Sequence, residues 1–360
     1  MKAYTESTIV ESFAVDEARS AAPPKVLILG TGVENDGRNN DLSETIYRLL
    51  KEKNWTVGFP EPLQRAGYVG FGRKLVSTLP RYEVVHFHVD AFRTFIKKIV
   101  PSLILSKFFG RKIVLSFTSA EIEFYLDRWG KVLRPVVLLA DIILVPSNYT
   151  AEILNRYGFK AETVPHCIDT RRFTFRTRRE LQPRILVNRT LELKNNIPCA
   201  LQAFRLVKQK YPRVELVIAG EGPLRRELEN IVRADNLNGV YVTGWVTPEK
   251  MTGLLNDVDL FLNPSTIDDF PISIFEAQAS GLPVITTDAG GILEMVSDRV
   301  NALVTPINNP GEVAQRIIEL VENPALTERL SYQGRYNAEK YDWANYTDRL
   351  GRLYRGLKRT

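Results

Sequence analysis

The densest group of residues able to do chemistry lies between residues 265 and 291. A turn-rich loop carrying Asp268 and Asp269 leads into Pro271, and Glu276 follows five residues later. Proline suits the first helical position, where its missing N–H would lack a partner anyway. Loop amides in front of a helix, together with the positive end of its dipole, favour an anion. A carboxylate just over one turn further on, Glu276, can accept two hydrogen bonds from hydroxyls such as those of a ribose.

Two other short segments carry groups that suit a ligand with an anionic group. Arg189 and Lys194 stand five positions apart after an apolar run. Two cations on one loop can neutralise a diphosphate and stabilise it as a leaving group while its charge grows. Gly290 and Gly291 offer a backbone that a ligand can approach closely. The alternatives are a solvated pair of surface charges and a plain turn.

The elements that must position these residues alternate between strand and helix. Apolar runs typical of buried parallel strands occupy residues 26–30, 82–89, 112–117, 141–147, 184–188, 214–220, 240–244, 260–265, 283–287 and 302–306. Helical patterns occupy residues 42–53, 148–157, 197–210, 224–234, 248–256, 272–280, 293–296 and 310–321. Such alternation predicts parallel sheets covered on both faces, with ligands at the carboxyl ends of the strands. The aperiodic basic stretch 170–183 predicts a linker between two α/β halves.

The composition is that of a globular protein. The chain has 360 residues, of which 44% are hydrophobic and 25% are charged. Its two cysteines, Cys167 and Cys199, form no metal-ligand or disulfide pattern, which favours a reducing compartment. We also expect neither a membrane-spanning helix nor a signal peptide, because no apolar run approaches about 20 residues and the start lacks the basic-then-apolar order. A cytoplasmic location is therefore predicted.

The positive charge is concentrated in the first half. Residues 63–135 hold thirteen Lys or Arg against five Asp or Glu. Within them, residues 91–112 mix aromatic and aliphatic side chains with six cations. Such a face can lie at an anionic membrane surface; core residues with charged edges are the alternative.

The segment 265–291 resembles the donor-binding motif of the retaining GT-B glycosyltransferases of family 4. Those enzymes place two acids eight positions apart, as Asp268 and Glu276 stand here, although the family's first acid is usually Glu. By this resemblance Glu276 holds the ribose of a nucleotide, and the backbone at Asp269 and Phe270 meets sugar hydroxyls or phosphate.

Four further segments agree in order and spacing. The stretch from Asn188 to Lys194 is similar to the family's first loop of the C-terminal domain. The loop containing Gly222 looks like the next one, and the turn ending at Val246 looks like the base-contacting turn. Residues 164–169 resemble the end of the N-terminal domain. The resemblance spans about residues 82–345.

In the first half, His88 ends a strand where the substrate cleft is expected, whereas His86 is interpreted as a buried, hydrogen-bonded histidine. Thr118 stands where the family commonly has a His near the transferred sugar. A hydroxyl cannot carry a proton near neutral pH, but the leaving phosphate can take the proton of the acceptor. Gly32 begins like a dinucleotide fingerprint that lacks its third glycine, and is predicted to lie in a cleft-lining turn.

The resemblance implies a GT-B fold of two Rossmann-like domains facing a central cleft. The expected boundaries are a flexible extension over 1–23, an acceptor domain over 24–177, and a nucleotide-sugar donor domain over 178–340. A helix over 341–357 is expected to return to the first domain. No cofactor and no metal are predicted, since Asp257 and Asp259 lack clustered ligands.

The implied function is a metal-independent, retaining transfer of a hexose-type sugar to a glycan or lipid-linked acceptor, as in polysaccharide biosynthesis. The enzyme would be cytoplasmic or peripheral at the inner face of a membrane. The alternatives are a weakened nucleotide-sugar-binding module and a sugar-nucleotide epimerase. A nucleic-acid-binding protein is the least favoured, because no aromatic-basic stacking segment is present.

Overall fold

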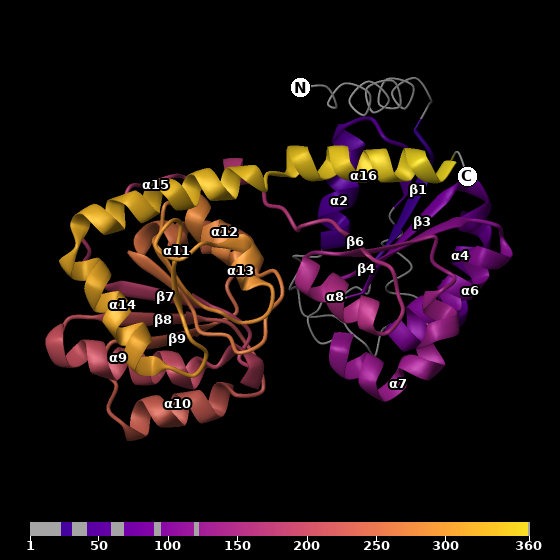
Figure 1. Ribbon diagram of the computed structural model, residues 1–360. Coiled ribbons are helices and arrows are strands. Elements are labelled where there is room, and N and C mark those ends of the chain that lie inside the picture. Colours follow the sequence, from indigo (N-terminus) through magenta and orange to yellow (C-terminus); the bar gives the residue numbers. More distant parts are fainter. Residues whose placement is uncertain (1–22, 31–41, 59–67, 90–94, 119–121, 359–360) are drawn as a thin grey trace, which may run out of the picture. The chain divides into compact units, whose positions relative to one another are not determined.

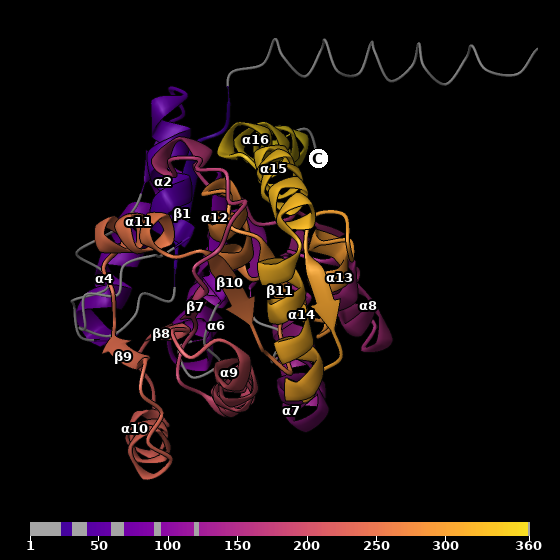
Figure 2. The same cartoon turned by 90° about the vertical axis from the view of Figure 1, so that its left-hand side faces the viewer.

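The computed structural model describes residues 23–30, 42–58, 68–89, 95–118 and 122–358. These residues form two compact units. The first contains the described residues up to Val145, Ile153–Val164 and those from Ala344 onward, and the second contains Pro146–Glu152 and Pro165–Trp343. Figures 1 and 2 show the elements of each unit in two views.

The first unit is built on one parallel sheet in the order β2-β1-β3-β4-β5-β6. The strands are β1 (Val26–Leu29), β2 (Val57–Gly58), β3 (Val84–Val89), β4 (Lys112–Phe117), β5 (Ile142–Val145) and β6 (Glu162–Thr163). Every residue of β1 and β3 is buried, as expected of central strands covered on both faces. The register pairs His88 with Ser116 at the carboxyl ends of β3 and β4.

Helices cover both faces of this sheet. They are α2 (Leu42–Glu52), α4 (Tyr68–Thr78), α6 (Val100–Phe108), α7 (Ile122–Val137), the part of α8 (Asn148–Arg156) from Ile153 onward and most of α16 (Trp343–Lys358), with short turns η1 (Leu79–Arg81) and η2 (Phe95–Ile99). Right-handed crossovers place α2 on one face and α4, α6 and α7 on the other. Within this unit, Figure 1 shows α2 and α16 above the sheet and α7 below it.

The second unit repeats the plan with a parallel sheet in the order β12-β11-β10-β7-β8-β9. The strands are β7 (Arg184–Asn188), β8 (Glu215–Ala219), β9 (Val240–Gly244), β10 (Leu260–Asn263), β11 (Val284–Thr287) and β12 (Leu303–Thr305). The helices are α9 (Ile197–Lys210), α10 (Arg225–Ala234), α11 (Pro248–Asp257), α12 (Ile272–Ala279), α13 (Ile292–Met295), α14 (Pro310–Glu322) and α15 (Pro324–Lys340), with short turns η3 (Thr170–Arg172) and η4 (Leu193–Asn195). Two apolar clusters fill the two sides of the sheet.

The predicted α/β class with two Rossmann-like domains is confirmed. The predicted spans of β4, β7, β9 and α9 match the observed ones residue for residue. The two-residue edge strands β2 and β6 were not predicted, because two residues carry no periodicity. Helices α4, α6, α7 and α15 were also missed; in α7, Gly130 and Pro135 interrupt the pattern.

The basic stretch 170–183 is packed into the second unit through Arg178, which is only 1% exposed. Its guanidinium donates to the carbonyl oxygens of Leu255 at 2.8 Å and of Ser280. Burial lowers the pKa of Arg178 to about 9. The charge therefore holds the ends of two helices together, because carbonyls at helix C-termini attract cations.

Residues 1–22 of the predicted extension lie outside the described residues. No helix in the described ranges is long and apolar enough to span a bilayer. Both cysteines are buried free thiols.

Candidate functional site

The predicted donor-site residues of the second half gather at one edge of the second sheet. Parallel pairing sets Asn188 beside Ala219 and Asn263 beside Thr286, so the loops after β7, β8, β10 and β11 leave from the same edge. This is the edge at which ligands bind in open α/β sheets. The first of these loops carries Arg189 and the third, after β10, carries Asp268.

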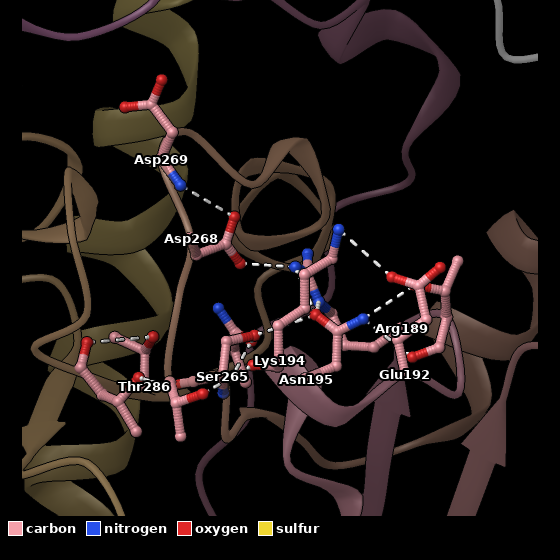
Figure 3. A network of polar contacts seen from close by, with 12 residues as sticks. Arg189, Glu192, Lys194, Asn195, Ser265, Asp268, Asp269 and Thr286 are labelled. Carbon is pink, nitrogen blue, oxygen red and sulfur yellow. Dashed lines mark hydrogen bonds and ion pairs between the residues drawn. The ribbon is translucent and has the colours of Figure 1, made fainter. Parts of the chain in front are cut away.

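Arg189 is the centre of a polar network at this edge (Figure 3). Its Nη2 lies 2.5 Å from Oδ2 of Asp268, and both side chains are largely buried, at 15% and 11% exposure. Its Nε and Nη2 also donate to Oδ1 of Asn195 at 3.1 and 2.9 Å. The guanidinium is thus held on two sides, and no described residue engages its Nη1.

Asn195 is a site residue that the sequence did not single out. It is 1% exposed, and its Nδ2 donates to the carbonyl oxygen and the hydroxyl of Thr190 at 2.8 and 2.7 Å. The hydroxyl of Ser265 donates to the Oδ1 that also receives Arg189. The amide is therefore satisfied on both ends, and its orientation is fixed by the network. Its position six residues after Arg189 was the only available signal.

Lys194 is joined to the same cluster by its side chain and its backbone. Its Nζ lies 3.1 Å from Oε2 of Glu192, and its carbonyl oxygen accepts the N–H of Thr266 at 2.7 Å. Both cations predicted to meet a diphosphate thus stand on one loop, and each has a carboxylate partner. A diphosphate would have to share or displace those carboxylates.

Asp269 uses its side chain within the protein. Its carboxylate accepts hydrogen bonds from the hydroxyls of Ser147 and, at 2.6 Å, Thr150, which belong to the second unit. Burial raises the pKa of Asp269 to about 6, although these two hydrogen bonds oppose the rise. Its N–H, predicted to meet the sugar or phosphate, donates to Oδ1 of Asp268 at 3.1 Å.

Glu276 lies in α12 and keeps partial exposure. Loss of water around the carboxyl raises its pKa to about 7, against the lowering effect of Arg172. A carboxyl group with a pKa near 7, in a helix that directly follows a candidate loop, is a candidate for ligand binding. Phe270, at the start of this segment, turns its ring inward against Phe275 and Tyr341, so only its backbone remains for a ligand.

The glycines of these loops are required by close packing. Gly290 has φ of +54°, and an added Cβ would collide with the carbonyl oxygen of Asp268. The N–H of Gly291 donates to that oxygen at 3.2 Å. At Gly222 a Cβ would meet the backbone of Leu191. These contacts explain the glycines without a ligand, and their role in donor binding stays a prediction, as does that of the half-buried Val246.

In the first unit, His88 is 3% exposed and neither ring nitrogen has a hydrogen-bond partner among the described residues. Burial lowers its pKa to about 3, so the ring is neutral. The prediction for His86 is confirmed: it is buried, and its nitrogens lie 2.6 Å from the hydroxyls of Tyr354 and Ser116. Thr118 donates to the carbonyl oxygen of Val89.

Gly32, the remaining predicted site residue, lies outside the described residues. Within the described ranges, no group of three or more His, Cys, Asp or Glu is arranged to hold a metal ion.

Solved structures define the fold class of the protein. Sucrose-phosphate synthase of Thermosynechococcus elongatus matches with a TM-score of 0.71 and 18% identity, over 93% of this chain and 99% of that one. HepE of Anabaena, in complex with UDP and glucose, matches with a TM-score of 0.71 and 16% identity, over 92% and 99%. At these identities the likeness shows the fold alone, which is GT-B.

The sequence comparisons relate the chain to glycosyltransferases. Residues 170–337 match the family model described as Glycosyl transferases group 1. The chain is 28% identical over 140 residues to an uncharacterized glycosyltransferase of Methanocaldococcus jannaschii, covering 39% of this chain and 40% of the relative. It is 26% identical over 213 residues to alpha-D-kanosaminyltransferase of Streptomyces kanamyceticus, covering 58% and 55%. The chain spans about half the length of the curated relatives it matches.

Proposed function

We propose that the protein is a retaining glycosyltransferase that moves a hexose-type sugar from a nucleoside-diphosphate sugar to a glycan or lipid-linked acceptor without a metal ion. The observation that carries the proposal is the network around Arg189 at the carboxyl edge of the second sheet. A guanidinium held between Asp268 and Asn195 is already oriented when a ligand arrives, which removes part of the cost of ordering it.

The proposed reaction exchanges one bond at the anomeric carbon. The bond from that carbon to the phosphate oxygen breaks, and the acceptor oxygen bonds to the same face of the sugar. The acceptor proton passes to the leaving nucleoside diphosphate, so no protein base is required. Charge grows on the leaving diphosphate, where Arg189 and Lys194 would stabilise it. Glu276 would accept hydrogen bonds from the ribose.

Several features support this assignment. The segment 170–337 has the sequence pattern of glycosyl transferases group 1. HepE, a structural neighbour, was solved with UDP-glucose. Another relative, AmsK of Erwinia amylovora, is described as an amylovoran biosynthesis glycosyltransferase. A role in polysaccharide assembly, and a cytoplasmic location peripheral to the membrane, form part of the proposal.

Calorimetric titration of UDP, GDP and ADP into the wild type and Glu276→Ala tests the donor site. Selective binding of one nucleotide, weakened at least about tenfold in the variant, is expected because a hydrogen bond to a charged group contributes ~1.5–3 kcal/mol. Tyr336→Ala, an exposed aromatic on α15, is the matched control and should bind as the wild type does. Absence of binding by folded protein would reject the proposal.

A second candidate is a nucleotide-sugar-binding module with weakened chemistry. It is favoured by Thr118 at the position where the family has His, and by the carboxylate already paired with each of the two cations. Release of sugar from the donor in the presence of acceptors separates the two candidates. Binding without turnover across a broad acceptor panel would select the module. The anomeric proton coupling of the product would establish retention.

A further inference from the structure

The outer side of α6 and α7 in the first unit exposes large apolar side chains. Ile104 and Phe108 on α6 are 53% and 84% exposed, and Phe124 and Val132 on α7 are 66% and 67% exposed. Each helix is anchored to the unit by other residues, such as Leu103 and Leu126, which are buried. The exposed side chains are therefore not needed to hold the helices in place.

These positions fall on one side of each helix. Phe108 follows Ile104 by four residues, and Val132 follows Phe124 by eight, which at 3.6 residues per turn brings each pair to one side. The two helices are neighbours on the same face of the sheet, and α7 lies at the lower edge of the first unit in Figure 1. We call the four apolar residues, with the cations described next, the α6–α7 face.

The cations of the α6–α7 face are Lys97, Arg128 and Lys131. All three are exposed, and no carboxylate of a described residue forms an ion pair with any of them. The two acids of α7 are turned to other partners: Glu123 pairs with Arg156 at 2.7 Å, and Asp127 accepts the hydroxyl of Tyr157. The outer side is therefore apolar and positively charged at once.

We infer that the α6–α7 face binds an anionic lipid surface. Aromatic and aliphatic side chains would enter the boundary between headgroups and acyl chains, while the flanking cations meet lipid phosphates. Charge complementarity selects this occupant, because the apolar side chains are interleaved with cations that lack carboxylate partners among the described residues. This surface does not depend on the proposed sugar transfer. Its failure would remove the peripheral location from the proposed function and leave the proposed transfer untouched.

The structure also corrects the surface expected from the sequence. Of the apolar residues between 91 and 112, Phe95, Ile99 and Leu103 are in the core, and Phe92 lies outside the described residues. The helix phase leaves Ile104 and Phe108 outward, with a smaller contribution from Ile96, and α7, which was not predicted, supplies the other half of the surface.

Vesicle sedimentation tests the inference on the full chain. Vesicles of phosphatidylcholine with phosphatidylglycerol should carry the protein down at low salt, whereas phosphatidylcholine alone should not. Phe108→Glu should weaken binding at least about tenfold, because it removes an exposed aromatic side chain that would enter the lipid surface and adds a charge that anionic lipid repels. Lys131→Ala should weaken it about fivefold, corresponding to ~1 kcal/mol per cation near the surface.

The matched control is Tyr336→Glu, which places the same charge on an exposed aromatic position of α15. It should sediment as the wild type does. Circular dichroism verifies that each variant is folded. The inference is overturned by no sedimentation at low salt, by equal sedimentation with neutral vesicles, by wild-type binding of Phe108→Glu, or by equal loss in the control. None of these results bears on nucleotide binding measured by calorimetry.

Discussion

The pH dependence of nucleotide affinity is a direct consequence of the environment of Glu276. Its pKa is raised to about 7 because its carboxyl has lost water. If the ionised carboxylate accepts hydrogen bonds from the ribose hydroxyls, only the ionised form of Glu276 binds the nucleotide well. The nucleotide then binds more tightly as pH rises through 7, and it lowers the pKa of Glu276 when bound.

The size of the effect comes from the ionised fraction. With a pKa of about 7, roughly one molecule in ten carries the carboxylate at pH 6 and roughly nine in ten carry it at pH 8. The dissociation constant should therefore fall about tenfold between these pH values, or ~1.4 kcal/mol. At pH 8, Glu276→Gln should bind on the order of tenfold more weakly, because a neutral amide offers one acceptor in place of a charged pair.

The assay is calorimetric titration of the preferred nucleotide at pH 6, 7 and 8 into both proteins. The terminal phosphate and Asp269, whose pKa is about 6, also titrate in this range. Both are present in Glu276→Gln, so the difference in slope between the two proteins isolates Glu276. Equal slopes, or equal affinities at pH 8, would refute the assignment of Glu276 to the ribose.

The same carboxyl affects stability with the opposite sign. A raised pKa means that the folded state holds the proton more tightly, so the free energy of unfolding falls as pH rises from about 4.5 to about 7. Glu276→Gln should therefore be more stable than the wild type at pH 8, by on the order of 2 kcal/mol after allowance for partial exposure. Thermal denaturation at pH 5 and pH 8 measures it.

Three other substitutions have expected outcomes. Asn195→Ala should weaken nucleotide binding about tenfold and lower the free energy of unfolding by ~1–3 kcal/mol, since Arg189 loses its orienting acceptor; titration and urea unfolding measure these, and unchanged affinity would exclude a positioning role. Tyr354→Phe should lower the free energy of unfolding by ~1–3 kcal/mol by removing one of the two hydrogen-bond partners of buried His86, with nucleotide affinity unchanged; a parallel loss of affinity would contradict this. Gly290→Ala should lower both stability and affinity, because φ of +54° and the neighbouring carbonyl leave no room for Cβ; a variant that melts with the wild type would show that the loop adapts.

The sheet and the candidate loops could be predicted because both have local sequence signals. Continuous apolar runs predicted the central strands, and the loop at Asp268 was marked by its turn residues before Pro271. The interactions of those residues were not predictable. The contact of Arg189 with Asp268 joins positions 79 apart, and depends on which strands are neighbours in the sheet.

The exposed residues show the same limit at the level of single helices. Alternating apolar and basic residues predict a surface, but not which residues face it. Phe95 and Phe108 look equivalent in the sequence, yet one is in the core at 2% exposure and the other is 84% exposed. The rotation of a helix about its axis relative to the sheet determines which of its side chains are buried. A turn of π-helix, η2 at Phe95–Ile99, changes that rotation.

The bond between His86 and Tyr354 joins residues 268 positions apart and lies inside the first unit. On the ribosome, a chain usually folds from its N-terminal domain onward. Strand β3 emerges early, but its hydrogen bond with α16 cannot form until α16 has been synthesised. The second unit, which consists of Pro146–Glu152 and Pro165–Trp343, is synthesised in the interval. The unit whose synthesis begins first is thus completed last. While its core is incomplete, its apolar residues are exposed, and this is the stage at which a chaperone would protect the chain most.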